Sequence, residues 1–268
     1  IDYAESMNIP VGATKEHSYS EDENMYHISY ESGELEDPAY PGHHTEGGYP
    51  GLVLKKKSVS LLDAPDEPAR LTIDFEQGNP VRVRNVDDGT EHTTPLAMFE
   101  YLNEIGGAHG VGRIDIVENR FVGMKSRGCY ETPGGTVLNA AHLDLEILTM
   151  DREVMRIRDG LSLKYAECVY NGYWFSPEMD FLNNAMDHAQ RHVTGSVDVQ
   201  LHKGNVINVG RSSPLSLYSE DLVSMDKEGG FDATLSTGFI KTLSTRLKAN
   251  VARGQLPGAP TTGTTTPV

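Results

Sequence analysis

Two parts of the chain alternate apolar and polar residues with a period of two. Each has turn-forming residues at its centre, at 77–80 and at 203–205. The apolar members are Leu71, Ile73, Phe75, Val81 and Val83 in the first part, and Val197, Val199, Leu201, Ile207 and Val209 in the second. This alternation is typical of half-buried strands, so the sequence predicts two β-hairpins.

Five other segments carry apolar residues at helical spacing. We expect helices at about 95–105, 136–149, 159–172, 177–193 and 239–251. Thr94-Pro95 and Ser176-Pro177 supply N-cap and first-turn signals, and Gly106-Gly107 ends the first helix. Because helices and hairpins come in blocks, the predicted class is α+β, with helices packed on an antiparallel sheet.

Charge and composition exclude several classes of protein. The chain of 268 residues has 39 acidic and 23 basic residues, a net charge of −16, so it offers no basic face to nucleic acid or to an anionic membrane. No run approaches the ~18–20 apolar residues that span a bilayer. The two cysteines, Cys129 and Cys168, are too few for a disulfide scaffold, and we expect free thiols in a cytoplasmic protein.

The ends of the chain and one internal segment are unlike the rest. Residues 1–50 contain eleven acids and a single lysine, and segment 38–51 is rich in Gly and Pro, which predicts a surface loop. Segment 55–57, three lysines, is interpreted as a solvated strand end. The Pro/Thr/Gly-rich segment 256–268 is expected to be a disordered tail.

Metal and phosphate motifs are weak. His188 and His192 have the i, i+4 spacing of zinc ligands but no third ligand, and the pair His43-His44 lies in the acidic loop. The four glycine pairs, which begin at residues 47, 106, 134 and 229, do not follow an apolar strand as a phosphate-binding loop does. We therefore expect no metal site and no nucleotide cradle in this chain.

Two segments carry chemistry worth testing. Segment 106–135 combines many glycines with charges of both signs, which favours a site for a zwitterionic small molecule. Segment 20–31 has two serines, nine residues apart, around a run of carboxylates; its chemistry alone favours a capped acidic helix start.

These segments resemble the argininosuccinate synthase family. The resemblance rests on Ser20–Asn24 with His27–Glu31, on the block Gly110–Gly128 with Tyr130–Thr136, and on three shorter matches at 163–167, 170–177 and 210–218. It extends from about Ile9 to about Val251.

The resemblance implies an ATP-dependent ligase that joins citrulline to aspartate through a citrullyl-adenylate, releasing AMP and pyrophosphate. It implies a homotetramer, and ATP with Mg²⁺ held mainly by an N-terminal domain that this chain does not match. The implied citrulline-binding residues are Ser20, Ser29, Glu118 and Tyr130; none is an obvious general base. A truncated, non-catalytic module that binds citrulline or only oligomerises is the alternative.

The expected organisation follows from the same match. Residues 1–15 would end the nucleotide-binding domain, 16–235 would form the synthetase domain, 236–253 the oligomerisation helix and 254–268 the tail.

Overall fold

The computed structural model describes residues 1–11, 20–41, 56–223 and 231–255. The chain divides into two compact units, Ile1–Leu217 and Tyr218–Val268. Within the described ranges, none of the helices combines the length and the apolar character needed to cross a bilayer. The expected loop at 38–51, the histidines 43–44 and the tail fall wholly or mostly outside these ranges.

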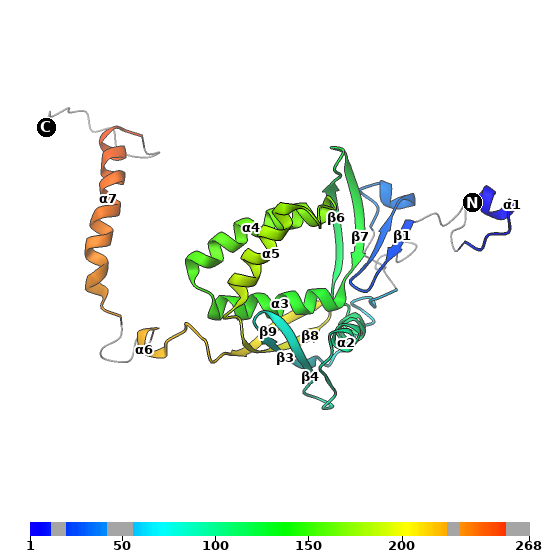
Figure 1. Ribbon diagram of the computed structural model, residues 1–268, viewed down its shortest axis with the longest axis horizontal. Helices are drawn as coiled ribbons and strands as arrows, with labels where there is room; N and C mark the ends of the chain where they lie inside the picture. The colour runs from blue at the N-terminus through cyan, green and yellow to red at the C-terminus, as the bar shows by residue number, and fades with distance from the viewer. Residues whose placement is uncertain (12–19, 42–55, 224–230, 256–268) are drawn as a thin grey trace. The chain divides into compact units, whose positions relative to one another are not determined.

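A five-stranded antiparallel sheet in the order β5-β4-β3-β8-β9 forms the base of the first unit (Figure 1). Its strands are β3 (Ala69–Glu76), β4 (Asn79–Asn85), β5 (Glu91–His92), β8 (Gly195–His202) and β9 (Asn205–Ser212). The inward side chains of β3 and β8 are buried, whereas Thr72 and Asp74 on the opposite face bond to polar neighbours. Both hairpins predicted from the alternation are confirmed.

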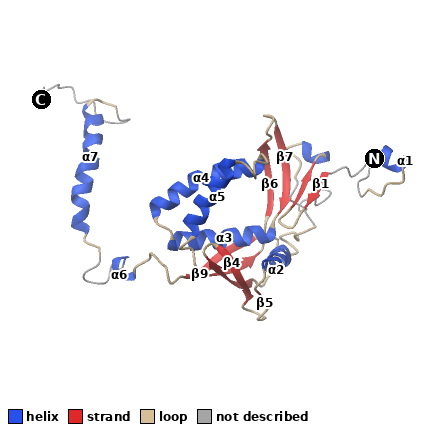
Figure 2. Ribbon diagram, viewed as in Figure 1, coloured by secondary structure: helices blue, strands red, loops and turns tan. Residues whose placement is uncertain are grey.

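Two helices cover the apolar face of this sheet. Helix α3 (Pro133–Thr149) packs on β8 and β9, and α2 (Pro95–Ala108) packs on α3 and β4 (Figure 2). Met98 and Leu102 of α2, with Ala141 and Leu145 of α3, join the strand residues in the main core. Both helices start with proline and match the predicted positions within three residues.

The next two helices, α4 (Arg152–Tyr170) and α5 (Pro177–Gln190), form a helical hairpin with its own core of Cys168, Met179 and Leu182. Helix α4 begins seven residues before the predicted start because the Asp151 carboxylate accepts hydrogen bonds from the backbone N–H groups of Glu153 and Val154. The Ser176 cap of α5 is confirmed.

A second antiparallel sheet, in the order β1-β2-β7-β6, carries the segments singled out in the sequence. Its strands are β1 (Ser20–Glu23), β2 (Ile28–Glu31), β6 (Arg113–Asn119) and β7 (Lys125–Glu131), and a short 3-10 helix, η1 (Gly33–Glu36), follows β2. The helix start expected in segment 20–31 is wrong. Asn24 instead holds a hairpin turn, its side-chain oxygen accepting from the N–H groups of Tyr26 and His27.

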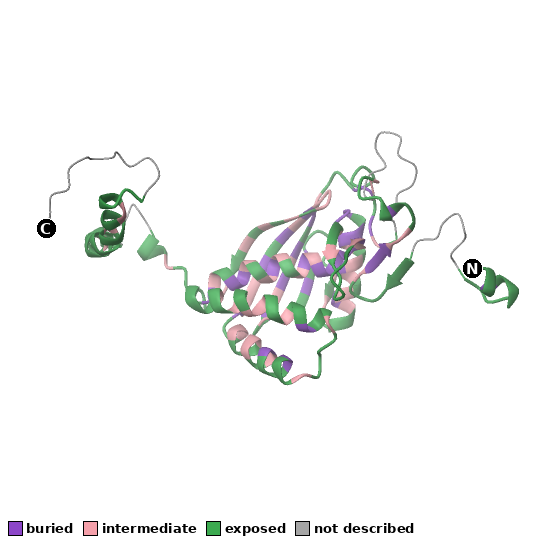
Figure 3. Cartoon of the chain, turned by 90° about the horizontal axis from the view of Figure 1, so that it is seen from above, coloured by how far each residue is buried: buried purple, intermediate pink, exposed green. Residues whose placement is uncertain are grey.

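The remaining elements are short or isolated. Helix α1 (Asp2–Ser6) lies at the N-terminus. The second unit contains α6 (Glu220–Val223), the 3-10 helix η2 (Ala233–Leu235) and α7 (Ser236–Ala252), whose bounds match the helix expected at 236–253. Helix α7 has no buried residue and is exposed along nearly all its length (Figure 3).

Candidate active site

One face of the four-stranded sheet brings together the four residues that the sequence proposes for citrulline. Ser29 of β2 pairs directly with Tyr130 of β7, Ser20 of β1 pairs with Glu31, and Glu118 of β6 pairs with Ser126. Because directly paired residues, and residues two apart on a strand, share a face, Ser20, Ser29, Glu118 and Tyr130 all lie on the same side. The strand register thus places the four residues on one surface.

One side-chain contact on this face joins Tyr130 to Glu118. The Tyr130 hydroxyl donates to Glu118 Oε2 at 3.1 Å. Burial, and then the neighbouring Glu118 charge, raise the pKa of Tyr130, so its hydroxyl remains a donor at neutral pH. A half-buried carboxylate oriented by a tyrosine can receive an ammonium group in a charge-assisted hydrogen bond.

Gly128 makes this contact possible. A Cβ on Gly128 would lie 2.6–2.8 Å from the outer atoms of the Tyr130 side chain, which shows that the ring lies across the backbone of its own strand. The glycines of this segment suggested a close approach of backbone to ligand. At Gly128 the close approach is made by Tyr130, so the glycine positions a side chain.

The two serines occupy different environments. Ser29 is buried, and its hydroxyl lies 3.4 Å from the Asp22 carbonyl oxygen, at the long end of hydrogen-bond range. Ser20 begins β1 and is exposed. The Ser29 hydroxyl thus has capacity for a further hydrogen bond beside Tyr130.

The opposite face of the sheet is structural. Arg127 donates to both carboxylate oxygens of Asp115 and to the carbonyls of Asp37 and Tyr40, and Cys129 is fully buried. Several charges that made segment 106–135 resemble a binding site therefore hold the fold together. Glu118 is on the open face, whereas Asp115 and Arg127 are not.

Glu131 anchors the sheet to segment 56–58. Its fully buried carboxylate accepts from the Tyr30 hydroxyl (2.6 Å), from the Ser58 hydroxyl (2.6 Å) and from the N–H groups of residues 56, 57 and 58 (2.9–3.2 Å). Sequence reasoning did not identify this residue, because most of its partners are backbone groups more than 70 positions away.

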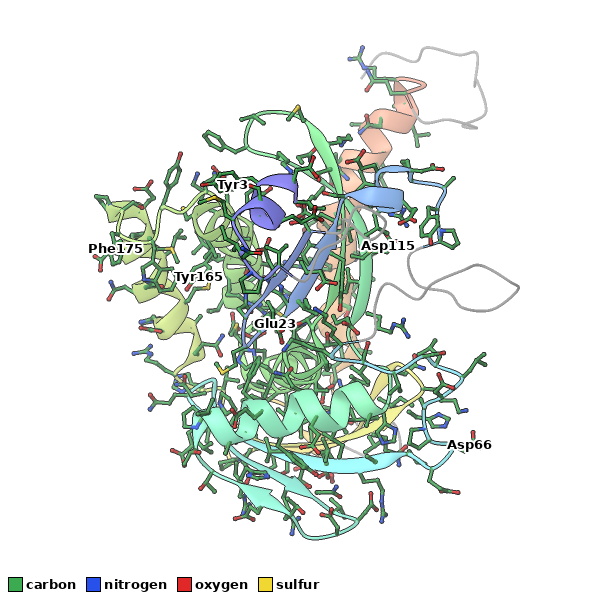
Figure 4. The ribbon with its side chains drawn as sticks, turned by 90° about the vertical axis from the view of Figure 1, so that its right-hand side faces the viewer. Tyr3, Glu23, Asp66, Asp115, Tyr165 and Phe175 are labelled. Atoms are coloured by element: carbon green, nitrogen blue, oxygen red, sulfur yellow. The ribbon has the colours of Figure 1, made fainter. Side chains whose placement is uncertain are left out.

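Segment 56–58 is also tied to β1. Lys56 pairs with Glu21, and Lys57 Nζ lies 2.9 Å from a carboxylate oxygen of Glu23. Residues 56 and 57 form a bend, so the strand end expected at 55–57 is wrong there; Lys56 is exposed, as expected, whereas Lys57 is partly buried, and Lys55 lies outside the described residues. Figure 4 shows Glu23 at the end of the strand that carries this contact.

The described residues contain no group of three His, Cys, Asp or Glu side chains arranged to hold a metal. His192 lies beyond the end of α5, and His188 contacts Arg191.

Two glycine pairs allow close packing. A Cβ on Gly107 would meet the Lys57 carbonyl, and one on Gly135 would meet the Tyr26 ring. The pairs at 47–48 and 229–230 lie outside the described residues.

Comparison with known proteins shows which family this chain resembles. Residues 19–250 match the family model described as Arginosuccinate synthase C-terminal domain. The chain is 56% identical over 250 residues to argininosuccinate synthase of Thermotoga sp. (strain RQ2), covering 93% of this chain and 59% of that protein. It is 52% identical to the human and 51% identical to the Danio rerio argininosuccinate synthase, covering 92% of this chain and 58% of each.

The chain therefore belongs to the argininosuccinate synthase family. It spans about three-fifths of the length of the curated relatives that it matches.

Proposed function

We propose that this chain supplies the citrulline-binding surface of an ATP-dependent carbon–nitrogen ligase that makes argininosuccinate. The observation that carries the proposal is the joint placement of Ser20, Ser29, Glu118 and Tyr130 on one sheet face, with Tyr130 hydrogen-bonded to Glu118. Glu118 would pair with the α-ammonium of citrulline, and the hydroxyls would bind its carboxylate and ureido groups.

The proposed reaction proceeds in two steps. The ureido oxygen of citrulline attacks the α-phosphorus of ATP, and pyrophosphate leaves. The amine of aspartate then attacks the ureido carbon, AMP leaves, and the nitrogen loses a proton. No residue of the face is an obvious general base, so we assign its contribution to orientation and charge stabilisation.

ATP with Mg²⁺, and aspartate, would bind mainly to the part of the ligase that the matched relatives have beyond this span. The glycine pairs that the structure describes are packed against other elements, which supports this division. We therefore expect the 268-residue chain to bind citrulline without releasing AMP from ATP. AMP release by this chain would contradict the proposal that ATP binds mainly outside this span.

Two further assignments belong to the same proposal. The exposed apolar residues of α7 support assembly into a homotetramer. Cys129 and Cys168, both buried and unpaired, support a cytoplasmic location, where thiols stay reduced.

The test measures citrulline binding by titration calorimetry for the chain and for Glu118→Gln. The variant keeps the shape but removes the negative charge, which should weaken binding by about 1.5–3 kcal/mol, or roughly ten- to hundredfold. Glu100→Gln, an exposed site on α2, is the matched control and should bind as the parent does. Equal affinities for Glu118→Gln and the parent would remove Glu118 from the site.

A further inference from the structure

A small pocket adjoins Tyr130 on the proposed citrulline face. Its volume is about 220 Å³, and none of its described lining residues carries a carboxylate, ammonium or guanidinium group. The lining residues are Tyr26, His27, Ile114, Ile116, Tyr130 and Thr132. Such walls accommodate a hydrocarbon chain and disfavour a charged group.

Thr132 contributes a hydroxyl that the fold leaves unused. It is the N-cap residue of α3, yet its side chain makes no capping hydrogen bond. The Gly134 N–H, a group that such a cap normally binds, instead donates to the Asn103 side chain of α2 at 2.9 Å. Thr132 lines the pocket, and its hydroxyl is buried and has no hydrogen-bond partner.

His27 contributes a second unused polar atom. Its ring meets the Tyr130 ring edge-on, with centroids 5.6 Å apart, and its Nδ1 is buried without a hydrogen-bond partner. An unpaired buried polar atom is unfavourable unless a ligand or a water satisfies it. Both atoms belong to residues that line one pocket, so a molecule bound there is a candidate partner for them.

The strand register places the pocket at a suitable distance from Glu118. Ile116 and Ile114 precede Glu118 by two and four residues on the same face of β6. The pocket therefore begins roughly 7 Å along the strand from the carboxylate. The α-ammonium and the α-carboxylate of an amino acid are attached to the same carbon atom, so both lie near Glu118 when the ammonium binds there. The pocket, farther along the strand, then receives the far end of the side chain.

We propose that His27 and Thr132 are specificity-determining residues that hydrogen-bond the neutral ureido end of citrulline, and that the pocket, which offers no carboxylate to a cation, disfavours amino acids with a cationic side chain. The inference rests on the proposed function. The imidazole and the hydroxyl can each donate or accept, which matches a ureido group carrying both a carbonyl and N–H donors.

The experiment measures binding of citrulline, norvaline and ornithine to the chain by titration calorimetry. Norvaline has the same α-amino acid head and alkyl chain but no ureido group, and ornithine ends in an ammonium. Thr132→Val removes the hydroxyl at nearly constant shape, Thr132→Ser restores it, and His27→Phe keeps a ring without nitrogen. Thr149→Val, a buried threonine of α3 outside the pocket, is the control.

We expect Thr132→Val and His27→Phe each to weaken citrulline binding roughly three- to tenfold, and to leave norvaline binding unchanged. Thr132→Ser and Thr149→Val should bind citrulline as the parent does, and ornithine should bind the parent more weakly than citrulline. Equal citrulline affinity for the parent, Thr132→Val and His27→Phe would overturn this inference while leaving the proposed function intact. A parent chain that binds no citrulline would overturn both.

Discussion

At the scale of single residues, a substitution at Gly128 should disturb the geometry of the site with little effect on the stability of the fold. Gly128→Ala would place a methyl group against the Tyr130 ring, which can swing away from its strand because the nearest atoms are at the outer end of the side chain. This movement of the Tyr130 side chain breaks its hydrogen bond to Glu118. We expect citrulline binding to fall at least tenfold, while the melting temperature changes by only a few degrees.

Gly160→Ala is the matched control for this experiment. Gly160 lies inside α4, and a Cβ there would meet no atom within 4 Å. The substitution should stabilise the chain by about 0.5–1 kcal/mol and leave citrulline binding unchanged. Normal citrulline binding by Gly128→Ala would show that the position of Tyr130 does not matter.

Cys129 makes stability sensitive to alkaline pH. Burial, and then the charge of Asp115, raise the pKa of its thiol to about 12. Between about pH 9 and pH 12 the unfolded chain ionises this thiol while the folded chain keeps it protonated, so stability present below pH 9 is lost as pH rises. We expect a loss on the order of 2 kcal/mol from this group by pH 10.5.

Urea denaturation at pH 7, 9 and 10.5 measures this effect. Cys129→Ala should be less stable than the parent at pH 7, because it leaves a cavity, but its stability should fall less between pH 9 and 10.5. Identical pH profiles for the two proteins would rule out Cys129 as a cause. A thiol titration of the denatured, unreduced chain should count two thiols, as the free state of Cys129 and Cys168 requires.

At the scale of elements, Glu131 holds segment 56–58 against the four-stranded sheet. Glu131→Ala leaves the Tyr30 and Ser58 hydroxyls and three backbone N–H groups without this acceptor. We expect a loss of more than about 3 kcal/mol in the free energy of unfolding. Tyr30→Phe removes one of these hydrogen bonds and should be less destabilising, by about 1–3 kcal/mol.

Urea denaturation of the two variants at pH 7 tests this ranking. Equal stabilities for Glu131→Ala and Tyr30→Phe would mean that the backbone hydrogen bonds of segment 56–58 contribute nothing to the anchor. Native-state hydrogen exchange should show faster exchange at residues 56–58 in Glu131→Ala, and protection unchanged from the parent there would count against the anchor.

The elements differ in how well their local sequence predicts them. The alternation of Leu71, Ile73 and Phe75 predicts β3 because one face of that strand is buried and the other is solvated. Strand β1 is exposed throughout and has no such alternation, so its local sequence resembles a helix start. The first two turns of α4 mix charged residues with Val154, Met155 and Ile157, and the start of this helix is set by the Asp151 cap.

At the scale of the whole molecule, the four proposed citrulline residues follow from family resemblance, whereas their arrangement required the structure. Ser20 and Glu118 are almost 100 positions apart, and only the strand order β1-β2-β7-β6 shows that they share a face. The same holds for Thr132, whose free hydroxyl depends on Asn103 of another helix taking over its cap. Contacts of this kind have no local sequence pattern, since each is set by long-range packing.

Helix α7 carries the last prediction, which concerns assembly. Phe239, Ile240, Leu243, Leu247 and Val251 recur at helical spacing, and 46–66% of each is exposed. A helix with such a row of exposed apolar residues gains stability by burying them against another surface. In the proposed tetramer, further copies of the chain would provide that surface.

Leu243→Asp places a charge in this row. It should shift the molar mass, measured by light scattering after size exclusion, from that of a tetramer towards smaller species. Thr245→Asp adds the same charge about 200° around the helix and should keep the parent mass. If Leu243→Asp also keeps the parent mass, the exposed row of α7 does not hold the oligomer together.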